Sequence, residues 1–115
     1  MSDDCLFCKI LKGEIPSTKV YEDEKVYAFK DINPLAKEHY LFIHRSHTAN
    51  VNEMSDESPE QIAEVYSGIS KFTKENGLVD SGYRVVTNIG KHGCQTVFHT
   101  HFHVLGGEQL KGFGS

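Results

Sequence analysis

Residues 99–107 read His-Thr-His-Phe-His-Val-Leu-Gly-Gly, and this stretch decides the prediction of the fold. Successive side chains of a β-strand point to opposite faces of its sheet, whereas a helix would scatter them. As a strand, the stretch lines one face with His99, His101 and His103 and turns the residues between them toward a core. Four of the seven histidines lie within residues 92–103, so we expect the chemistry of the protein on this strand.

The rest of the chain supplies partners for the histidine strand. Short apolar runs bounded by polar or turn residues predict five strands, which lie near residues 20–21, 26–29, 40–43, 83–88 and 96–105. A charged tetrapeptide, residues 22–25, separates the first two strands and suits a hairpin connection. Asp31-Ile32-Asn33-Pro34 is predicted as a loop, because Pro34 restricts Asn33 and lacks a backbone donor.

Two helices are predicted from apolar residues at helical spacing. A short one covers residues 4–12, and Gly13 ends it. The long one begins at Ser58, where Pro59 and Gln61 complete a capping-box pattern, and it stops at Gly77. Its buried stripe consists of Ile62, Val65, Ile69 and Phe72. Together the elements predict a single α+β domain over residues 1–115, with a five-stranded antiparallel sheet, one long helix and one short helix.

Composition limits the class of protein. Hydrophobic residues make up 38% of the chain and charged residues 24%, as in ordinary soluble proteins, and no apolar run approaches the roughly 18 residues of a membrane span. The net charge of −4 argues against polymeric nucleic acid as a partner, because Lys and Arg supply most of that affinity. The acidic start Met-Ser-Asp-Asp lacks the basic region of a secretory signal. We therefore expect a cytoplasmic protein without a membrane partner.

The spacing of the histidines alone leaves three interpretations open. A neutral imidazole attacks phosphorus or carbonyl carbon when its other nitrogen is held by an acceptor, and His101 suits this role because a histidine lies on either side. Histidines spaced by two on a strand are also a good template for a metal ion. The third interpretation is a set of surface histidines on an edge strand.

The flanks of the histidine strand favour a phosphate ligand. Gly93-Cys94-Gln95-Thr96 offers backbone N–H groups and a hydroxyl, which can hold a phosphate without Lys or Arg. Neither a Walker loop nor a dinucleotide fingerprint is present. Asp31 suits the two hydroxyls of a ribose, and it equally suits a turn.

With these motifs in view, the chain resembles the histidine triad family, and within it the histidine triad nucleotide-binding proteins. The resemblance covers nearly the whole chain and rests on Phe-Cys-Lys-Ile (7–10), Gly-Glu-Ile-Pro (13–16), Tyr-Glu-Asp (21–23), Ala-Phe-Lys-Asp-Ile-Asn-Pro (28–34), Gly-Tyr-Arg (82–84) and Gln-Thr-Val-Phe-His-Thr-His-Phe-His-Val-Leu-Gly-Gly (95–107). It implies a homodimer whose sheet runs through both protomers, binding of purine nucleoside monophosphates, and hydrolysis of nucleoside phosphoramidates such as adenylated lysine.

The resemblance also implies roles for individual residues. His101 is the nucleophile, and His103 contacts the phosphate and helps to handle protons. Asp31 binds the ribose hydroxyls, and His39 helps to orient the nucleophile. Phosphate contacts are implied for Asn88, the backbone around Cys94, Gln95 and Thr96. An apolar slot for the base is implied for Leu6, Phe7, Ile10, Phe29 and Ile32, of which we expect Ile10 and Phe29 in the core first.

Cys5 and Cys8 form a Cys-X-X-Cys pair that needs two more ligands for a tetrahedral zinc. The resemblance implies that His47 and His99 complete the site, as in members of the wider family that keep the pair. A redox pair lacks its usual βαβ context, and two buried inert thiols are a third alternative. We expect a structural zinc and no catalytic metal.

The function expected from these residues is a nucleotide-binding hydrolase that cleaves purine nucleoside phosphoramidates through a nucleotidyl-histidine intermediate. Two alternatives stay open: a hydrolase of dinucleoside polyphosphates or a nucleotidyl transferase, and a regulatory or scaffold protein that binds nucleotides with incidental activity. The chain departs from its relatives at His44, at Cys94 and in the short tail 108–115. We expect His44 and His92 to be exposed and to have no role.

Overall fold

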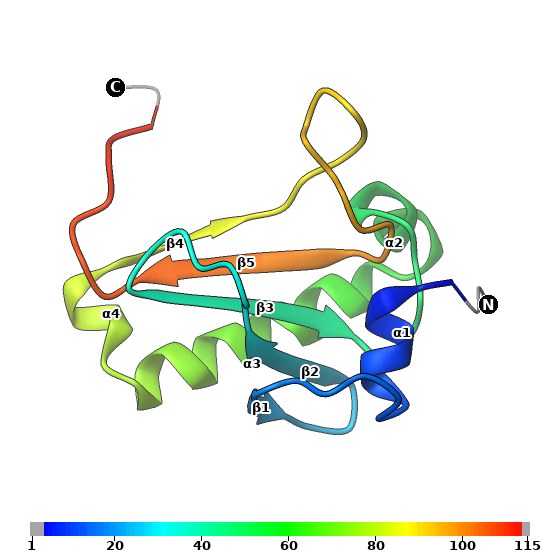
Figure 1. Cartoon of the computed structure of the whole chain (residues 1–115), viewed down its shortest axis with the longest axis horizontal. Coiled ribbons are helices and arrows are strands. Elements are labelled where there is room, and N and C mark those ends of the chain that lie inside the picture. Colours follow the sequence, from blue (N-terminus) through cyan, green and yellow to red (C-terminus); the bar gives the residue numbers. More distant parts are fainter. Residues whose placement is uncertain (1–3, 114–115) are drawn as a thin grey trace.

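The computed structural model describes residues 4–113, and its centre is a five-stranded antiparallel sheet (Figure 1). In spatial order the strands are β1 (Lys19–Glu22), β2 (Val26–Lys30), β3 (Glu38–His44), β5 (His101–Gly106) and β4 (Tyr83–Val86). The helices are α1 (Leu6–Leu11), α2 (Val51–Glu57), α3 (Pro59–Glu75) and α4 (Leu78–Ser81). The predicted α+β architecture is confirmed, and α2 and α4 are two short helices that the sequence analysis missed.

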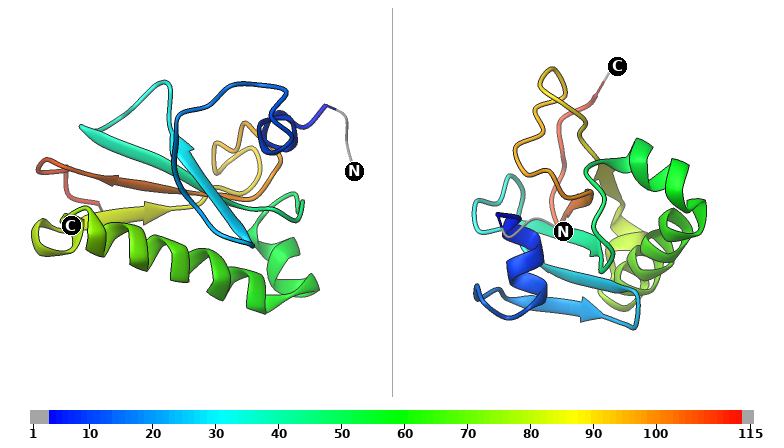
Figure 2. Two further views of the ribbon diagram at one scale, coloured as in Figure 1. Left: turned by 90° about the horizontal axis from the view of Figure 1, so that it is seen from below. Right: turned by 90° about the vertical axis from the view of Figure 1, so that its right-hand side faces the viewer.

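The two faces of the sheet are covered by different helices. α3 runs along one face, and α1 lies against the other (Figure 2). Alternation along β5 divides its side chains between these faces. Phe102 and Val104 join the core under α3, with Val65, Ile69 and Phe72. His101 and His103 therefore face the side of α1.

The long helix begins and ends where the sequence predicts, but its N-terminal cap differs. Ser58 is the N-cap residue and Pro59 follows it. The Ser58 hydroxyl donates to a Glu60 carboxylate oxygen at 3.0 Å and makes no cap hydrogen bond, so the capping-box prediction is wrong. Gly77, which follows the end of the helix, has the left-handed φ of +72° that favours glycine. No helix in residues 4–113 is long and apolar enough to cross a membrane.

The histidine strand is shorter than the prediction. β5 begins at His101 and not at residue 96, and β4 ends at Val86 and not at residue 88. Contacts between Thr48 and Thr100 hold the segment before β5 away from the sheet. The Thr100 N–H donates to the Thr48 carbonyl at 2.8 Å, and the two hydroxyl oxygens lie 2.6 Å apart. His99 consequently lies outside the strand, although it is fully buried.

Candidate functional site

His101 and His103 lie in the part of β5 where β3 continues to pair with the strand and β4 ends. His103 pairs with Leu41 of β3 and with Val86, the last residue of β4. His101 pairs with Ile43 of β3 alone, because β4 has already ended. The sheet is therefore open beside His101 on the side of the loop that follows β4.

The ring of His101 is held with one nitrogen committed. Its Nδ1 lies 2.8 Å from the carbonyl oxygen of His99. A carbonyl only accepts, so Nδ1 carries the proton and Nε2 keeps a lone pair. Burial lowers the pKa of His101 below its ordinary value, against the opposing effect of that hydrogen bond, and the ring is neutral at physiological pH. A neutral imidazole with a fixed Nδ1–H is the form that attacks phosphorus.

His103 is oriented by a chain of hydrogen bonds that starts at the backbone. The Leu35 N–H donates to Nδ1 of His39 at 3.0 Å, so the proton of the neutral His39 ring is on Nε2. That Nε2 lies 2.9 Å from Nδ1 of His103, to which it donates. His103 is thereby left with its own proton on Nε2. His39 thus has the hydrogen-bonded role that is the alternative to orienting the nucleophile, and an effect of His39 on His101 stays a prediction.

Electrostatics keep these rings neutral. Burial, with the neighbouring His101 and His39 rings, lowers the pKa of His103 to about 4. Burial also lowers the pKa of His39, and the Asp31 carboxylate opposes it. The Asp31 oxygen lies 3.4 Å from Nε2 of His39. Asp31 thus lies at the edge of the histidine site, where its other carboxylate oxygen accepts from the Asn33 N–H at 2.8 Å, and binding of a ribose stays a prediction.

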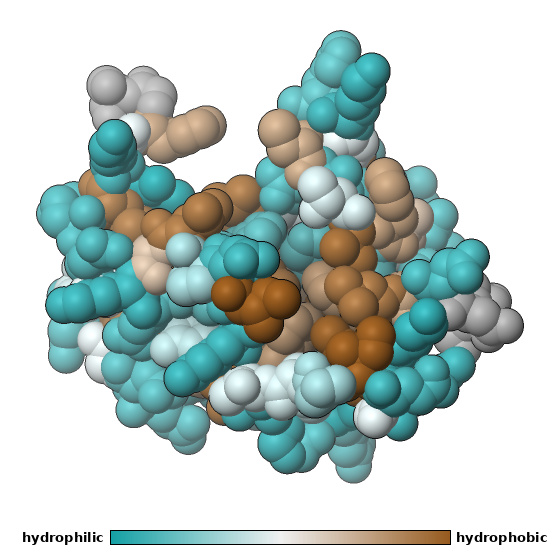
Figure 3. All heavy atoms as spheres, viewed as in Figure 1, coloured by the Kyte–Doolittle hydropathy of each residue, from teal (hydrophilic) through white to brown (hydrophobic). Residues whose placement is uncertain are grey.

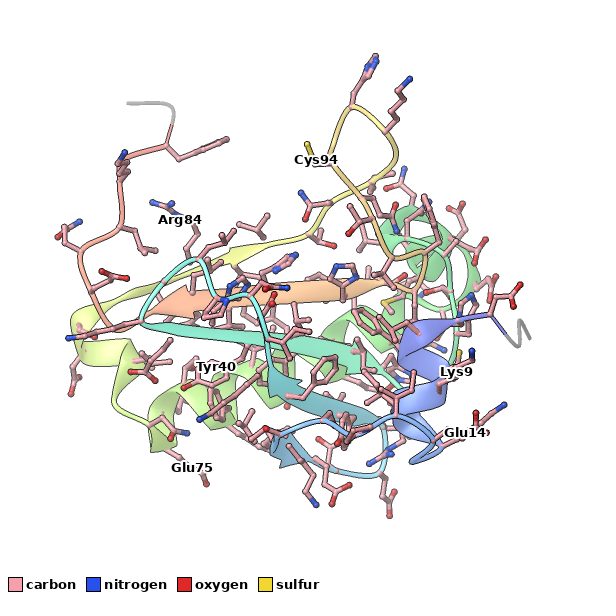
Figure 4. All side chains as sticks on the ribbon, viewed as in Figure 1. Lys9, Glu14, Tyr40, Glu75, Arg84 and Cys94 are labelled. Atoms are coloured by element: carbon pink, nitrogen blue, oxygen red, sulfur yellow. The ribbon has the colours of Figure 1, made fainter. Side chains whose placement is uncertain are left out.

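Several predicted phosphate-binding residues hold the loop that follows β4. Figure 4 shows this loop projecting beyond the sheet and labels one of its residues, Cys94. The Asn88 side-chain amide donates to the Gly93 carbonyl at 2.7 Å. The Gln95 side chain accepts from the Gly90 N–H and donates to the Ala49 and Val97 carbonyls. The Cys94 N–H donates to the Lys91 carbonyl at 3.1 Å. Thr96 is exposed, and the phosphate contacts themselves stay predictions.

The predicted apolar slot is divided between core and surface. Phe7, Ile10 and Phe29 are buried in a second apolar cluster, on the face of α1, as expected for Ile10 and Phe29. Ile32 is 90% exposed and Leu6 is 42% exposed. Figure 3 shows apolar side chains gathered over the middle of this face and around α1. The ring of Phe7 lies edge-on to His101, with 5.1 Å between ring centroids, a contact that the sequence analysis missed.

The four predicted metal ligands lie together. The ligand atoms of Cys5, Cys8, His47 and His99 are all within 4.8 Å of one another. Nδ1 of His99 lies 3.4 Å from Sγ of Cys5 and 3.1 Å from Nδ1 of His47, and Sγ of Cys8 lies 3.3 Å from Nδ1 of His47. A tetrahedral zinc separates sulfur from nitrogen ligands by about 3.5 Å, and two nitrogens by about 3.3 Å. The donor set and its spacing fit zinc.

The chemistry of the thiols agrees with a metal site. Burial, followed by the hydrogen bond and the charge of Cys5, raises the pKa of the Cys8 thiol to about 11. Redox-active cysteines have lowered pKa values instead. A divalent cation would supply the positive charge that a buried thiolate requires. The observations therefore favour a zinc site over a redox pair.

We expected His44 to be exposed, and that prediction is wrong. Its side chain is buried, accepts from the Ser46 N–H at 3.0 Å and contacts a Glu64 carboxylate oxygen at 2.9 Å. The His44 carbonyl lies 3.2 Å from Nε2 of His99, which fixes the proton on that nitrogen and leaves Nδ1 for a metal. Glu64 lies on α3, twenty residues away, so no local signal reveals this pair. His92 is exposed as expected.

Comparison with known proteins agrees with this geometry. A family model described as HIT domain matches residues 12–110. The purine nucleoside phosphoramidase of Escherichia coli (strain K12) is 38% identical over 110 residues, which cover 96% of this chain and 92% of that protein. A 14 kDa zinc-binding protein of Zea mays is 46% identical over 107 residues, which cover 91% of this chain and 83% of that protein. The structure of a HIT family hydrolase from Clostridium thermocellum has a TM-score of 0.93 and 42% identity, with both chains covered completely. The chain therefore belongs to the HIT domain family.

Proposed function

We propose that the protein hydrolyses purine nucleoside phosphoramidates, such as adenylated lysine, through a nucleotidyl intermediate on His101. The observation that carries the proposal is the 2.8 Å contact between Nδ1 of His101 and the His99 carbonyl, which leaves Nε2 as the attacking atom. The similarity to the Escherichia coli purine nucleoside phosphoramidase supports the reaction class, and the resemblance to a hydrolase of known structure supports hydrolysis.

The first step exchanges one bond to phosphorus for another. Nε2 of His101 forms a bond to phosphorus, and the P–N bond breaks with its electron pair going to the leaving amine. The amine leaves with a proton that its nitrogen already carries as an ammonium group, because the neutral His103 ring has one proton only, on Nε2, and uses it to hold the phosphate. The His101 ring then bears a positive charge, which the His99 carbonyl stabilises through Nδ1–H.

In the second step water replaces the histidine. The water oxygen bonds to phosphorus, the P–Nε2 bond breaks, and the electron pair returns to Nε2. The proton from water goes to solvent. The products are a nucleoside monophosphate and an amine, and the neutral ring of His101 is restored.

The substrate contacts in this proposal come from the family resemblance. Asp31 would accept the ribose hydroxyls, Phe7 and Ile32 would contact the base, and His103 would donate to a phosphate oxygen. Asn88, the Cys94 backbone, Gln95 and Thr96 would bind or shape the loop around the phosphate. A homodimer of single-domain chains in the cytoplasm belongs to the same proposal, and sedimentation velocity would measure the oligomeric state.

We also propose that Cys5, Cys8, His47 and His99 bind one structural zinc ion. The distances between their ligand atoms support it, as does the similarity to the zinc-binding protein of Zea mays. The zinc would hold the N-terminal segment to the histidine strand and take no part in either chemical step. Elemental analysis of protein purified without added metal should find close to one zinc per chain, and a metal-free protein of unchanged stability would disprove the site.

Turnover of a fluorogenic adenosine phosphoramidate tests the function. We expect His101→Ala to lower kcat by at least about 1,000-fold, as removal of a nucleophile does, whereas the control His92→Ala keeps the wild-type rate because its side chain is exposed. A wild-type rate in His101→Ala would refute the nucleophile. Faster turnover of a diadenosine polyphosphate at equal concentration would favour the alternative hydrolase, and tight binding of adenosine monophosphate without turnover would favour a regulatory protein.

A further inference from the structure

Two different contacts hold the ring of His101. One is made by a member of the metal cluster, which consists of Cys5, Cys8, His47 and His99, and the other by a residue that lies between two of its members in the chain. The first contact is the His99 carbonyl, which accepts from Nδ1 at 2.8 Å. The second is the ring of Phe7, whose plane makes an angle of 88° with that of His101. No other segment of the sequence connects the N-terminal helix so directly with the proposed nucleophile.

The first contact places one residue in two roles. Nδ1 of His99 points into the metal cluster, 3.4 Å from Sγ of Cys5, while its carbonyl oxygen holds His101. His99 precedes β5 and has no strand partner of its own. The His99 carbonyl belongs to the peptide group whose N–H, on Thr100, donates to the Thr48 carbonyl at 2.8 Å. The acceptor that fixes the tautomer of His101 is therefore held through the backbone, whereas the His99 ring is held by the metal cluster.

The second contact depends on α1. Phe7 lies between Cys5 and Cys8 in the chain, and its ring is 4% exposed, packed between Phe29 and His101. α1 has only six residues, a length at which a helix is not stable in water without tertiary contacts. Its N-cap is the Sγ of Cys5, which accepts the Cys8 N–H at 3.2 Å. The cap residue of α1 and one residue of its first turn are thus proposed metal ligands.

We propose that α1 is a metal-dependent clamp on His101, in which zinc held by Cys5 and Cys8 fixes the helix and Phe7 acts as the positioning residue for the nucleophile. This inference rests on the proposed role of His101. It goes further because it makes the metal cluster a regulator of the reaction without any contact between metal and substrate. Loss of zinc releases α1 and the Phe7 ring, and the His101 ring loses the aromatic contact that orients it and shields it from water.

The clamp is tested first with the full-length protein, zinc-loaded and after treatment with a chelator. The structural readout is the ring Nδ1–H proton of His101 in a ¹⁵N-edited NMR spectrum, assigned by its loss in His101→Ala. We expect this resonance in the zinc-loaded protein, its disappearance by solvent exchange after zinc removal, and its return on addition of Zn²⁺ alone. A resonance that persists without zinc would overturn the proposal. Loss of the entire far-ultraviolet circular dichroism would overturn it too, because the effect would not be confined to α1.

Substitution of Phe7 separates the clamp from the metal. In Phe7→Leu, with one zinc retained, we expect the His101 resonance to broaden and kcat for the adenosine phosphoramidate to fall about 10- to 100-fold with little change in KM. The matched control is Phe72→Leu, because Phe72 is equally buried at 4% but packs under the opposite face of the sheet. Phe7→Met, whose unbranched and flexible side chain adapts better to an irregular space, takes its place if Phe7→Leu does not fold.

The outcomes distinguish the clamp from the proposed function. If zinc-loaded wild type turns over the phosphoramidate and Phe7→Leu raises KM without lowering kcat, Phe7 only contacts the base, and the clamp is wrong while the function stands. If wild type has no turnover but zinc removal still abolishes the His101 resonance, the clamp stands and the function is wrong. Equal losses of kcat in Phe7→Leu and Phe72→Leu would also overturn the clamp.

Discussion

Two clusters of histidines and other donor groups flank His101, and they look alike in composition. One consists of Cys5, Cys8, His47 and His99, and the other of Asp31, His39 and His103; in both, the candidate ligand atoms lie within 4.8 Å of one another. The protons on their imidazoles make the difference. In the metal cluster, Nε2–H of His99 donates a hydrogen bond to the His44 carbonyl outside the cluster, so the lone pair of Nδ1 points inward.

The cluster of Asp31, His39 and His103 has the opposite arrangement. A backbone N–H occupies Nδ1 of His39, so the proton of His39 points inward to His103. A metal would have to displace that proton and leave the N–H of Leu35 without an acceptor. The comparison teaches that the group behind each imidazole, and not the number of donors, decides whether a cluster can offer lone pairs to a metal.

The strongest way to break the comparison is to remove a metal ligand. Cys8→Ser should lose zinc and lower the free energy of unfolding by several kcal/mol, because metal binding is part of folding. For a chain of this length, that corresponds to a fall in Tm of more than about 10 °C. Differential scanning calorimetry measures Tm, and elemental analysis measures the zinc content. The control Cys94→Ser, at an exposed thiol, should change Tm by little, and an equal fall in both variants would contradict the metal site.

Removing the hydrogen bond from His39 to His103 should leave the zinc content unchanged and slow the reaction. His39→Ala frees the His103 ring, whose N–H would donate to a phosphate oxygen, and should lower kcat about 10- to 100-fold because that donor is no longer oriented. His39→Gln, whose amide N–H can still donate to His103, should recover part of that loss. Steady-state kinetics provide the measurement, and a loss of zinc in His39→Ala would show that the two clusters are not independent.

The smallest expected effect is on stability in acid. His103 has a folded-state pKa of about 4, below its ordinary value of 6.5, so the unfolded chain binds more protons between these values. The stabilisation is complete above pH 6.5 and declines as the pH falls toward 4. Between pH 7 and pH 5 we expect wild type to lose roughly 1 kcal/mol more than His103→Gln. Urea titration at each pH measures the free energy of unfolding of both proteins. Their difference removes the contribution of the metal cluster, which both proteins share. Equal losses would refute the lowered pKa of His103.

Sequence alone predicted the parts of the molecule that depend on local pattern. The alternation of Phe102 and Val104 with His101 and His103 gave the faces of β5, and the stripe of α3 was correct. The start of β5 was wrong because the contact between Thr48 and Thr100 joins segments 52 residues apart. Long-range hydrogen bonds of this kind leave no periodic signal in the chain.

The candidate site divides in the same way. Cys5, Cys8, His47 and His99 were grouped from the Cys-X-X-Cys motif and the family resemblance, and they lie together. His44 was misjudged because its burial depends on Glu64 in α3. The contact of Phe7 with His101 was missed because the resemblance assigned Phe7 to the base slot, and no local pattern places its ring against a strand so distant in the sequence.

The three thiols differ in exposure, so their reactivity would report whether the protein contains the proposed zinc. Cys94 is exposed, while Cys5 and Cys8 are buried within the metal cluster. A thiol reagent should therefore modify one cysteine per chain while zinc is bound, and three after zinc has left. A maleimide dye on Cys94 would also place a single optical probe on the loop beside the histidines, so that metal occupancy and ligand binding can be followed in one sample.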